Sequence, residues 1–237
     1  MLISLIIFSK APIPGYAKRR LIPSIGKQRA AELQQEMTTA MVTQALAADI
    51  GETNLFCAPD TTHELFQNLA RQHSISLVTQ QGESLGDKMS HAIETTFTSS
   101  KDTQNSVEAV ILMGSDCPQL NKEKLLRVST ELKKHEIVLI PATDGGYVLI
   151  AMRNHYPTLF QNINWGSDQV MSTTIQRIDA LAVSWSALPA LTDIDCAEDL
   201  FCRIIDLTLY GNPSFPATEC NGQRFRSVLK LECEITV

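Results

Sequence analysis

Short apolar segments alternate with segments of helical periodicity along most of this 237-residue chain, and this alternation restricts the possible folds more than any other feature. The first apolar segment, residues 2–8, is rich in isoleucine and is followed closely by Pro12, which is typical of a strand buried on both faces. Apolar residues then recur at helical spacing over residues 27–48. Strands separated by helices of about a dozen residues indicate parallel crossover connections.

The same alternation continues toward the C-terminus. Further strands are predicted at residues 54–58, 75–79, 107–113, 136–140, 147–152 and 181–185, and helices at residues 62–72, 87–97, 122–134, 168–178 and 197–207. We therefore expect an α/β fold with a three-layer, Rossmann-like architecture, in which a mostly parallel sheet is flanked by helices. Because the sequence contains no internal repeat or linker, we expect one domain over residues 1–207 and an additional C-terminal segment, residues 208–237, to which no role is assigned.

The composition disfavours several classes of protein. The chain has 44% hydrophobic and 19% charged residues, which is typical of globular proteins, and it has no apolar segment of the length needed for a membrane span. Its net charge of -6 argues against nucleic acid as a partner, because phosphate backbones require a basic surface. The six cysteines lack the spacing of metal or redox motifs, so we expect reduced thiols. The apolar start has no basic residues before it, and together with the lack of a membrane span this favours a cytoplasmic protein.

A basic loop follows the first predicted strand, although the chain as a whole is acidic. Its four cationic side chains are Lys10, Lys18, Arg19 and Arg20. Pro12 restricts the backbone, Gly15 permits close approach to a ligand, and lysine and arginine form charge-assisted hydrogen bonds with phosphate oxygens. Ligands of parallel α/β sheets bind beyond the carboxyl ends of the strands, so this position favours a phosphate-binding loop over an ordinary solvated loop.

Three more polar segments follow predicted strands, at residues 80–86, 114–118 and 143–146, and all should meet the basic loop at one edge of the sheet. Asp116 directly follows a buried strand, where it could bind a magnesium ion or cap the next helix. Asp144, Gly145 and Gly146 form a strong turn signal that would suffice for a hairpin. The same residues could instead contact a sugar or acceptor, with Asp144 as the catalytic base.

A further acidic segment spans residues 193–199. Asp193 and Asp195 alternate in an extended stretch, so both carboxylates should point to one side, and either could be the second ligand of a metal bound by Asp116. Glu198 and Asp199 fall in the first turn of a predicted helix, where acidic residues complement the helix dipole. The two tryptophans, Trp165 and Trp185, are expected to pack rather than to stack on a nucleobase.

Together these segments resemble the bacterial DUF2064 family, the radical-SAM/selenodomain-associated transferase 1 group. The resemblance rests on six short motifs in order: FxKxPxPGxxKxRL at residues 8–21, LGxxM at 85–89, GSDCP at 114–118, DGGY at 144–147, Trp165, and DxDxxEDL at 193–200. The chain departs from the family pattern at Arg19, at residues 166–167 and at Cys196.

The resemblance implies the nucleotide-diphospho-sugar transferase fold, which is shared with GT-A glycosyltransferases and with nucleotidyltransferases. It further implies that Lys18 and Arg20, together with Lys10, meet the phosphates of a nucleotide. The residues that it places near the nucleobase are Gln81, Gly82, Leu85 and Gly86. It implies Asp116 and Asp195 as ligands of Mg²⁺ or Mn²⁺.

The expected function is metal-dependent glycosyl transfer from a nucleotide-diphospho-sugar to an acceptor that the sequence does not identify. A nucleotidyltransferase that releases pyrophosphate from a nucleoside triphosphate is the alternative, because one fold can support either reaction. A nucleotide-binding protein without catalytic activity is a third possibility. The products distinguish the two enzymes: a nucleoside diphosphate in the first case and pyrophosphate in the second.

Overall fold

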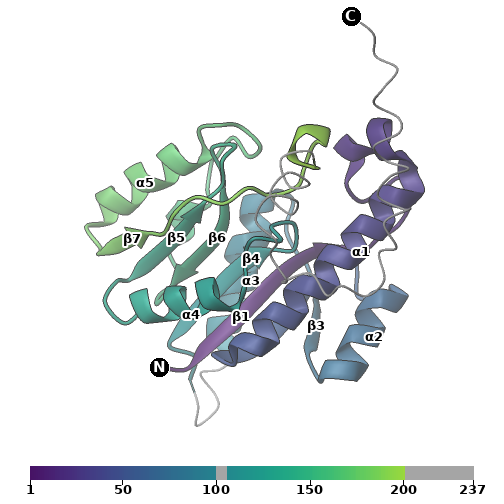
Figure 1. Cartoon of the computed structure of the whole chain (residues 1–237). Coiled ribbons are helices and arrows are strands. Elements are labelled where there is room, and N and C mark those ends of the chain that lie inside the picture. The colour runs from purple at the N-terminus through teal and green to yellow at the C-terminus, as the bar shows by residue number, and fades with distance from the viewer. Residues whose placement is uncertain (100–105, 201–237) are drawn as a thin grey trace, which may run out of the picture. The chain divides into compact units, whose positions relative to one another are not determined.

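The computed structural model describes residues 1–99 and 106–200, which form an α/β structure around a seven-stranded sheet (Figure 1). In spatial order the strands are β3 (Ser76–Thr79), β2 (Gly51–Ala58), β1 (Ile3–Lys10), β4 (Ala109–Gly114), β6 (Tyr147–Met152), β5 (Ile137–Pro141) and β7 (Trp185–Ala187). The helices are α1 (Ile22–Ala48), α2 (Glu64–His73), α3 (Leu85–Ser99), α4 (Lys122–Glu131) and α5 (Val170–Leu181), with 3-10 turns η1 (Arg19–Leu21) and η2 (Pro157–Leu159).

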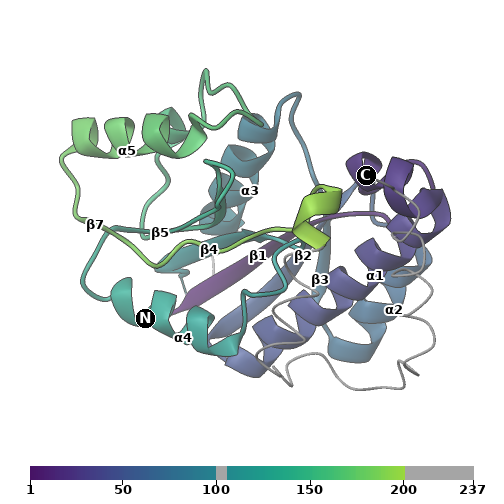
Figure 2. The same cartoon turned by 45° about the horizontal axis from the view of Figure 1, so that its top comes forward.

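Helices cover both faces of the sheet. Figure 2 shows α3 and α5 on one side and α1, α2 and α4 on the other. This arrangement is the three-layer fold that the alternation predicts, with a mostly parallel sheet flanked by helices. The predicted domain boundary near residue 207 and the segment 208–237 lie outside the described residues.

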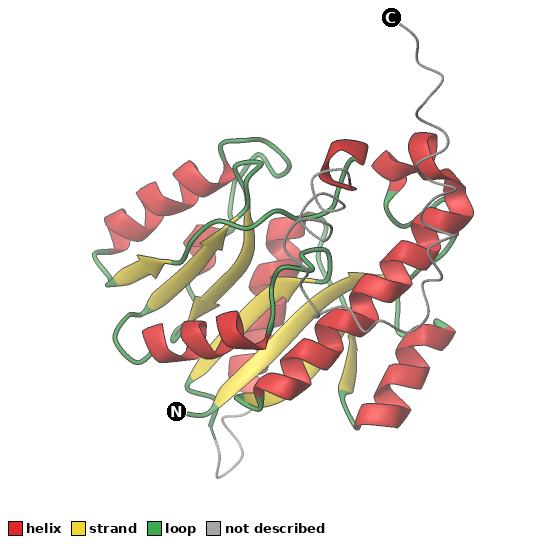
Figure 3. Cartoon of the chain, in the orientation of Figure 1, coloured by secondary structure: helices red, strands yellow, loops and turns green. Residues whose placement is uncertain are grey.

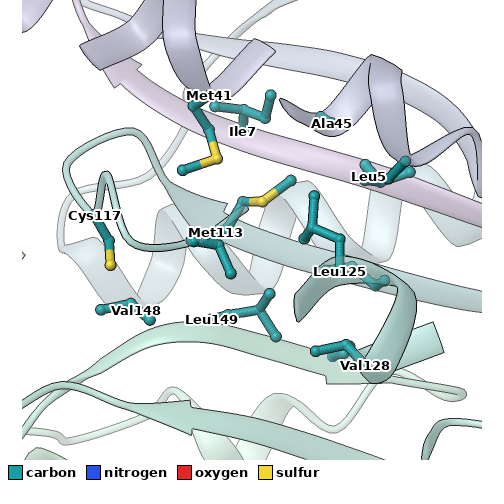
Figure 4. Close-up of a cluster of buried hydrophobic side chains, with 14 of the residues drawn as sticks. Leu5, Ile7, Met41, Ala45, Met113, Cys117, Leu125, Val128, Val148 and Leu149 are labelled. Atoms are coloured by element: carbon teal, nitrogen blue, oxygen red, sulfur yellow. The ribbon is translucent and has the colours of Figure 1, made fainter. Parts of the chain in front are cut away.

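The sheet carries apolar side chains on both faces, because successive residues of a strand point to opposite sides. Leu5 and Ile7 of β1 belong to one buried cluster, whereas Ile6 belongs to the cluster on the other face. Figure 4 shows the first cluster, in which side chains of α1, α4, β4 and β6 gather around Leu5 and Ile7 of β1. The labelled members from these elements are Met41, Ala45, Met113, Leu125, Val128, Val148 and Leu149.

One strand runs against the rest. β6 is antiparallel to both of its neighbours, β4 and β5, whereas the other strand pairs of the sheet are parallel. Residues 143–146 form the tight turn between β5 and β6, and Ala142 N donates to Gly146 O at 3.0 Å across it. The turn signal therefore does mark a hairpin, but its second strand is inserted between β4 and β5.

Most element boundaries lie within a few residues of the predicted ones. The sequence predicts a helix that starts at Lys27. In the structure α1 starts at Ile22, but Gly26 has non-helical backbone angles (φ 78°, ψ 163°), so a first short turn is separated from the main helix that follows it. The predicted strand at residues 181–185 is misplaced, because α5 continues to Leu181 and ends with Ala182 in the left-handed region; β7 begins only at Trp185. Residues 197–200 are helical, as predicted, and the remainder of that helix lies outside the described residues.

Two cysteines of the described residues are buried as free thiols. Cys57 lies in β2 and Cys117 follows β4, and burial raises the thiol pKa of each to about 12. Neutral, inaccessible thiols of this kind act as small apolar side chains. Within the described ranges, none of the helices combines the length and the apolar character that crossing a membrane requires.

Candidate functional site

The polar segments that follow β1, β3, β4 and β5 meet at the carboxyl edge of the sheet, as predicted. In Figure 3 these loops, in green, continue from the arrowhead ends of the strands. Ser115 N, after β4, donates to Phe8 O of β1 at 3.1 Å. Gln80 Nε2, after β3, donates to Phe56 O at 2.9 Å and to Ser9 O at 3.3 Å. Direct hydrogen bonds therefore hold three of the four segments together.

Lys18 lies at the centre of this edge. Its side chain is only 5% exposed, and Nζ donates to Ile194 O at 2.6 Å. The same ammonium lies 3.3 Å from Asp116 Oδ2 and 3.6 Å from Asp195 Oδ1. One ammonium thus joins the basic loop, the end of β4 and the acidic segment. The two predicted metal ligands, Asp116 and Asp195, both lie within 4 Å of it.

The other cations of the basic loop remain accessible. Arg20 pairs with Asp195 through Nη1 and Oδ2 at 2.8 Å, yet its side chain is 67% exposed. Lys10, at the end of β1, and Arg19 are also exposed. Lys10 is close enough to help lower the pKa of Asp116 through its charge. Three cations can therefore meet an incoming anion without first leaving the protein interior. Pro12 is buried in the same loop and Gly15 has a φ of 88°.

Asp116 is held ionised by its surroundings. Burial acts to raise the pKa of its carboxyl, but the charge and hydrogen bond of Lys18, together with Lys10, bring that pKa below its ordinary value. A Cβ on Gly114 would lie 2.5 Å from Asp116 Oδ1, so the residue before the turn must be glycine for the carboxylate to fold over it. Asp116 does not cap α4, because Asn121 Oδ1 accepts from Lys124 N at 3.2 Å instead.

The acidic segment and the residues just before it, from Leu191 on, lie across the ends of β5 and β4. Leu191 N donates to Pro141 O at 2.9 Å, Thr143 N donates to Leu191 O at 3.0 Å, and Ile194 N donates to Asp116 O at 2.9 Å. At its far end Asp199 Oδ2 accepts from the backbone N–H groups of Asp195 and Cys196 at 2.8 and 2.7 Å. Asp199 thus has the structural role that its position predicts.

Negative charge is concentrated around Asp193. Burial raises the pKa of Asp193 to about 6, and the charges of Asp116 and Asp144 add to this rise, while Lys18 opposes it. The Lys18 ammonium acts on both Asp193 and Asp195, and the orientation of their carboxylates toward one side stays a prediction. The site therefore has more carboxylates than its buried cation can balance.

These carboxylates suit a hard divalent cation in their chemistry. Such ions prefer oxygen ligands, and Mg²⁺ is commonly held by one or two carboxylates together with phosphates and water. The Lys18 ammonium already shows that Asp116 and Asp195 can share a single positive charge. Over residues 1–99 and 106–200, however, no group of three or more His, Cys, Asp or Glu side chains could hold a metal by itself. Oxygen atoms of a ligand or of water would have to complete the coordination.

The hairpin turn uses its own polar groups. Asp144 is exposed, and its Oδ1 accepts from Gly146 N at 2.9 Å. Gly145 has a φ of 93° and packs so closely on Asp168 that a Cβ would collide with the Asp168 backbone; its carbonyl accepts from Met171 N at 2.8 Å. Gly145 is therefore required by the close packing on Asp168, and contact between either glycine and a sugar stays a prediction.

The loop predicted to contact the nucleobase has two different parts. Gln81 and Gly82 are exposed between β3 and α3, and Leu85, the first residue of α3, is 46% exposed. Gly86 is buried, and a Cβ there would collide with Phe160 O and lie 2.7 Å from Trp165 Nε1. Gly86 is thus explained by packing, while the three exposed residues remain available to a ligand.

Both tryptophans pack, as expected. Trp165 forms an edge-to-face contact with Tyr147, with ring centroids 6.2 Å apart, and it is packed against the buried cluster that contains Ile6. Trp185 packs against the same cluster, and its Nε1 donates to Asp179 Oδ1 at 3.1 Å. The positions of both indoles are therefore explained by packing, without a nucleobase.

The predictions above did not include a buried polar network beneath the site. Gln34 Nε2 of α1 donates to Ser9 Oγ (3.2 Å), Thr38 Oγ1 (3.1 Å) and Ser115 Oγ (3.0 Å), and all four residues are buried. The network joins α1 to the ends of β1 and β4, directly before Asp116. A signal was present in the sequence, because Gln34 lies at helical spacing within an otherwise apolar stripe.

Solved structures share this fold. One from Desulfovibrio desulfuricans G20, provisionally assigned as a nucleotide-diphospho-sugar transferase, has a TM-score of 0.84 and 25% identity over 98% of both chains. CMP:2-keto-3-deoxy-manno-octonic acid synthetase complexed with CTP has a TM-score of 0.52 and 10% identity over 88% of this chain and 100% of the other. Rv0371c of Mycobacterium tuberculosis H37Rv in complex with manganese has a TM-score of 0.50 and 14% identity over 87% of this chain and 99% of the other.

These similarities identify the nucleotide-diphospho-sugar transferase fold. No curated protein matches the chain in sequence. A family of bacterial proteins described as uncharacterized, DUF2064, matches residues 28–167, which is more than half of the 237 residues. The basic loop and Asp195 lie outside that match. The chain belongs to the DUF2064 family.

Proposed function

We propose that the protein is a metal-dependent glycosyltransferase that uses a nucleotide-diphospho-sugar donor. The observation that carries this proposal is the meeting of Asp116 and Asp195 at one cation, beside the exposed Lys10 and Arg20. Paired carboxylates next to accessible cations suit a diphosphate that binds together with a divalent metal. The similarity over nearly the whole chain to a structure assigned as a nucleotide-diphospho-sugar transferase supports the same class of donor.

In the proposed complex the basic loop binds the diphosphate. Lys10 and Arg20 form charge-assisted hydrogen bonds to its oxygens, while the exposed residues Gln81, Gly82 and Leu85 lie on the side assigned to the nucleobase. Asp116 and Asp195 would hold Mg²⁺ or Mn²⁺. When bound, the metal would offset the negative charge that develops on the departing diphosphate.

The transfer itself exchanges one bond to the sugar. An acceptor hydroxyl oxygen forms a bond to the anomeric carbon, the bond from that carbon to the diphosphate oxygen breaks, and the nucleoside diphosphate leaves with the bonding electrons. Asp144 is the proposed base that takes the hydroxyl proton. Its carboxylate is exposed and is oriented by the hydrogen bond from Gly146 N, so it is accessible to an acceptor.

A thermal-shift screen of nucleotides and nucleotide sugars, with and without Mg²⁺ or Mn²⁺, tests this proposal. A ligand at about 100 times its dissociation constant adds about 2.7 kcal/mol to the free energy of unfolding. We expect a metal-dependent shift that Asp116→Asn abolishes. Asp49→Asn is the matched control, because Asp49 is exposed at the C-terminus of α1, at the opposite edge of the sheet. No shift with any ligand, or an unchanged shift in Asp116→Asn, would refute the proposal.

Nucleotidyl transfer is the second candidate, and it is favoured by the similarity to a CTP-bound synthetase. In that reaction the same basic loop and carboxylates would hold a nucleoside triphosphate, and pyrophosphate would leave. Product analysis separates the two enzymes. Release of a nucleoside diphosphate from a nucleotide sugar supports glycosyl transfer, whereas release of pyrophosphate from a triphosphate supports the second candidate. Tight nucleotide binding without turnover would indicate a binding protein.

A further inference from the structure

Lys18 differs from Lys10 and Arg20, although the resemblance implies phosphate binding for all three. Its ammonium is engaged with Asp116, Asp195 and the Ile194 carbonyl, and its side chain is 5% exposed. Arg20, two residues later, is 67% exposed. In this arrangement Lys18 cannot reach a diphosphate unless it first leaves the carboxylates.

The backbone of Lys18 supports its unusual position. Lys18 has φ 46° and ψ 48°, which is the left-handed region that side chains other than glycine, asparagine and aspartate rarely adopt. Such conformations persist where surrounding contacts determine them. Here the contacts that hold the residue include the ion pairs of its own ammonium, so a change in those ion pairs can release it.

We propose that Lys18 is an exchangeable counter-ion that a divalent metal displaces from Asp116 and Asp195. This inference rests on the proposed metal role of these two carboxylates. A divalent ion coordinated by both carboxylates repels an ammonium that lies 3.3 and 3.6 Å from the same oxygens, so the two cations exclude each other. The displaced ammonium then joins Lys10 and Arg20 at the phosphate side of the loop.

The exchange couples two binding events. Without metal, Lys18 balances the carboxylates and is unavailable to phosphate. With metal, the carboxylates are balanced by the ion, and the Lys18 ammonium is added to the cations of the basic loop that already face the diphosphate. Metal and diphosphate therefore assist each other even where they do not touch, because the same lysine is removed from one site and added to the other.

Amine labelling of the wild-type protein tests the exchange directly. An amine-reactive reagent followed by mass spectrometry gives the labelling rate of each lysine, with MnCl₂ as the only added ligand. We expect saturating Mn²⁺ to raise the labelling rate of Lys18 by about tenfold, because labelling follows the population of the released side chain. Lys133 is the control, since it is exposed two residues after the end of α4, away from the site, and its rate should not change. An unchanged rate for Lys18 would overturn the inference.

A variant tests the same competition through the affinity of the protein for the metal. Lys18→Met removes the competing charge, so Mn²⁺ should bind about tenfold more tightly than in wild type, as measured from the free-Mn²⁺ signal by electron paramagnetic resonance. Lys133→Met should bind Mn²⁺ as wild type does. Equal or weaker binding by a folded Lys18→Met would show that Lys18 supports the carboxylates instead of competing with the metal. If that variant does not fold, the labelling experiment on wild type decides.

The outcome of these two experiments is independent of the proposed glycosyl transfer, because neither experiment uses a nucleotide. Release of Lys18 by Mn²⁺ together with a negative donor screen would retain the exchange and reject the transferase. Metal-dependent turnover of a donor while Lys18 stays protected would retain the transferase and reject the exchange.

Discussion

Gln34→Leu is the most informative test of how the fold supports the candidate site. The substitution keeps a side chain of similar size on the buried face of α1 but removes the amide that donates to Ser9, Thr38 and Ser115. Nothing that could touch a ligand is changed, because all four residues are buried. Any effect must therefore act through the network that lies directly before Asp116.

The magnitude follows from the hydrogen bonds. The amide has only two hydrogens, so its three contacts correspond to about two full hydrogen bonds, each worth about 0.5–1.5 kcal/mol. Thr38 keeps its bonds to Ser9 Oγ at 2.7 Å and to the Gln34 carbonyl at 2.8 Å, but Ser115 Oγ loses its Gln34 partner. Adding about 1 kcal/mol for a buried hydroxyl without that bond gives about 3 kcal/mol in total. In a domain of this size such a loss lowers Tm by about 6–12 °C.

Urea denaturation and calorimetry measure this loss. Gln35→Leu is the matched control, because Gln35 is the next residue of α1 and is exposed, so the same change there should alter stability by less than about 0.5 kcal/mol. A Gln34→Leu protein as stable as the control would refute the reasoning, since it would show that the buried hydroxyls lose nothing without the amide.

Three further predictions test packing and charge. Gly86→Ala forces a methyl group into a backbone carbonyl and should lower the free energy of unfolding by about 3 kcal/mol. Gly166→Ala, at φ 84° with open space around it, should lower it by about 1 kcal/mol, and thermal denaturation of both variants measures the difference. Leu125→Ala should cost about 3 kcal/mol because Leu125 is fully buried, and the exposed neighbour Leu126 should tolerate the same change within about 0.5 kcal/mol in urea. The pKa of Asp193, raised to about 6, means that the folded protein binds this proton more tightly than the unfolded chain. With chelator present, wild type should therefore gain about 1–2 kcal/mol relative to Asp193→Asn as pH falls from about 7 to 4, and a difference independent of pH would contradict the assignment.

The architecture and the edge of the sheet that carries the site were predictable from local patterns. Apolar segments such as residues 2–8 identify buried strands, and the rule that ligands bind beyond the carboxyl ends of strands brings Lys18 and Asp116 together before any coordinates are known. The position of β6 was not predictable, because a turn signal at residues 144–146 gives a hairpin but does not say between which strands it inserts.

The burial of Lys18 was not predictable for a related reason. In the sequence Lys18 and Arg20 are similar cations of one loop. Both pair with Asp195, but only Lys18 has a left-handed backbone, and its ammonium also bonds to Asp116 and to the carbonyl of Ile194, which lies about 175 residues away in the sequence. The importance of Gln34 was likewise decided by hydroxyl groups on two strands that no local pattern connects to α1.

The inserted strand β6 also determines how long the connection from Leu191 to Ile194 must be. β6 separates the ends of β5 and β4, which therefore lie two strand spacings apart, about 10 Å. The three residues from Leu191, bonded to the end of β5, to Ile194, bonded to Asp116, span about the same distance when extended. Three residues are therefore about long enough to cross β6 and connect the two anchors. Substitutions within the segment are compatible with this geometry, but an insertion or deletion would move Asp195 away from Lys18 and Arg20.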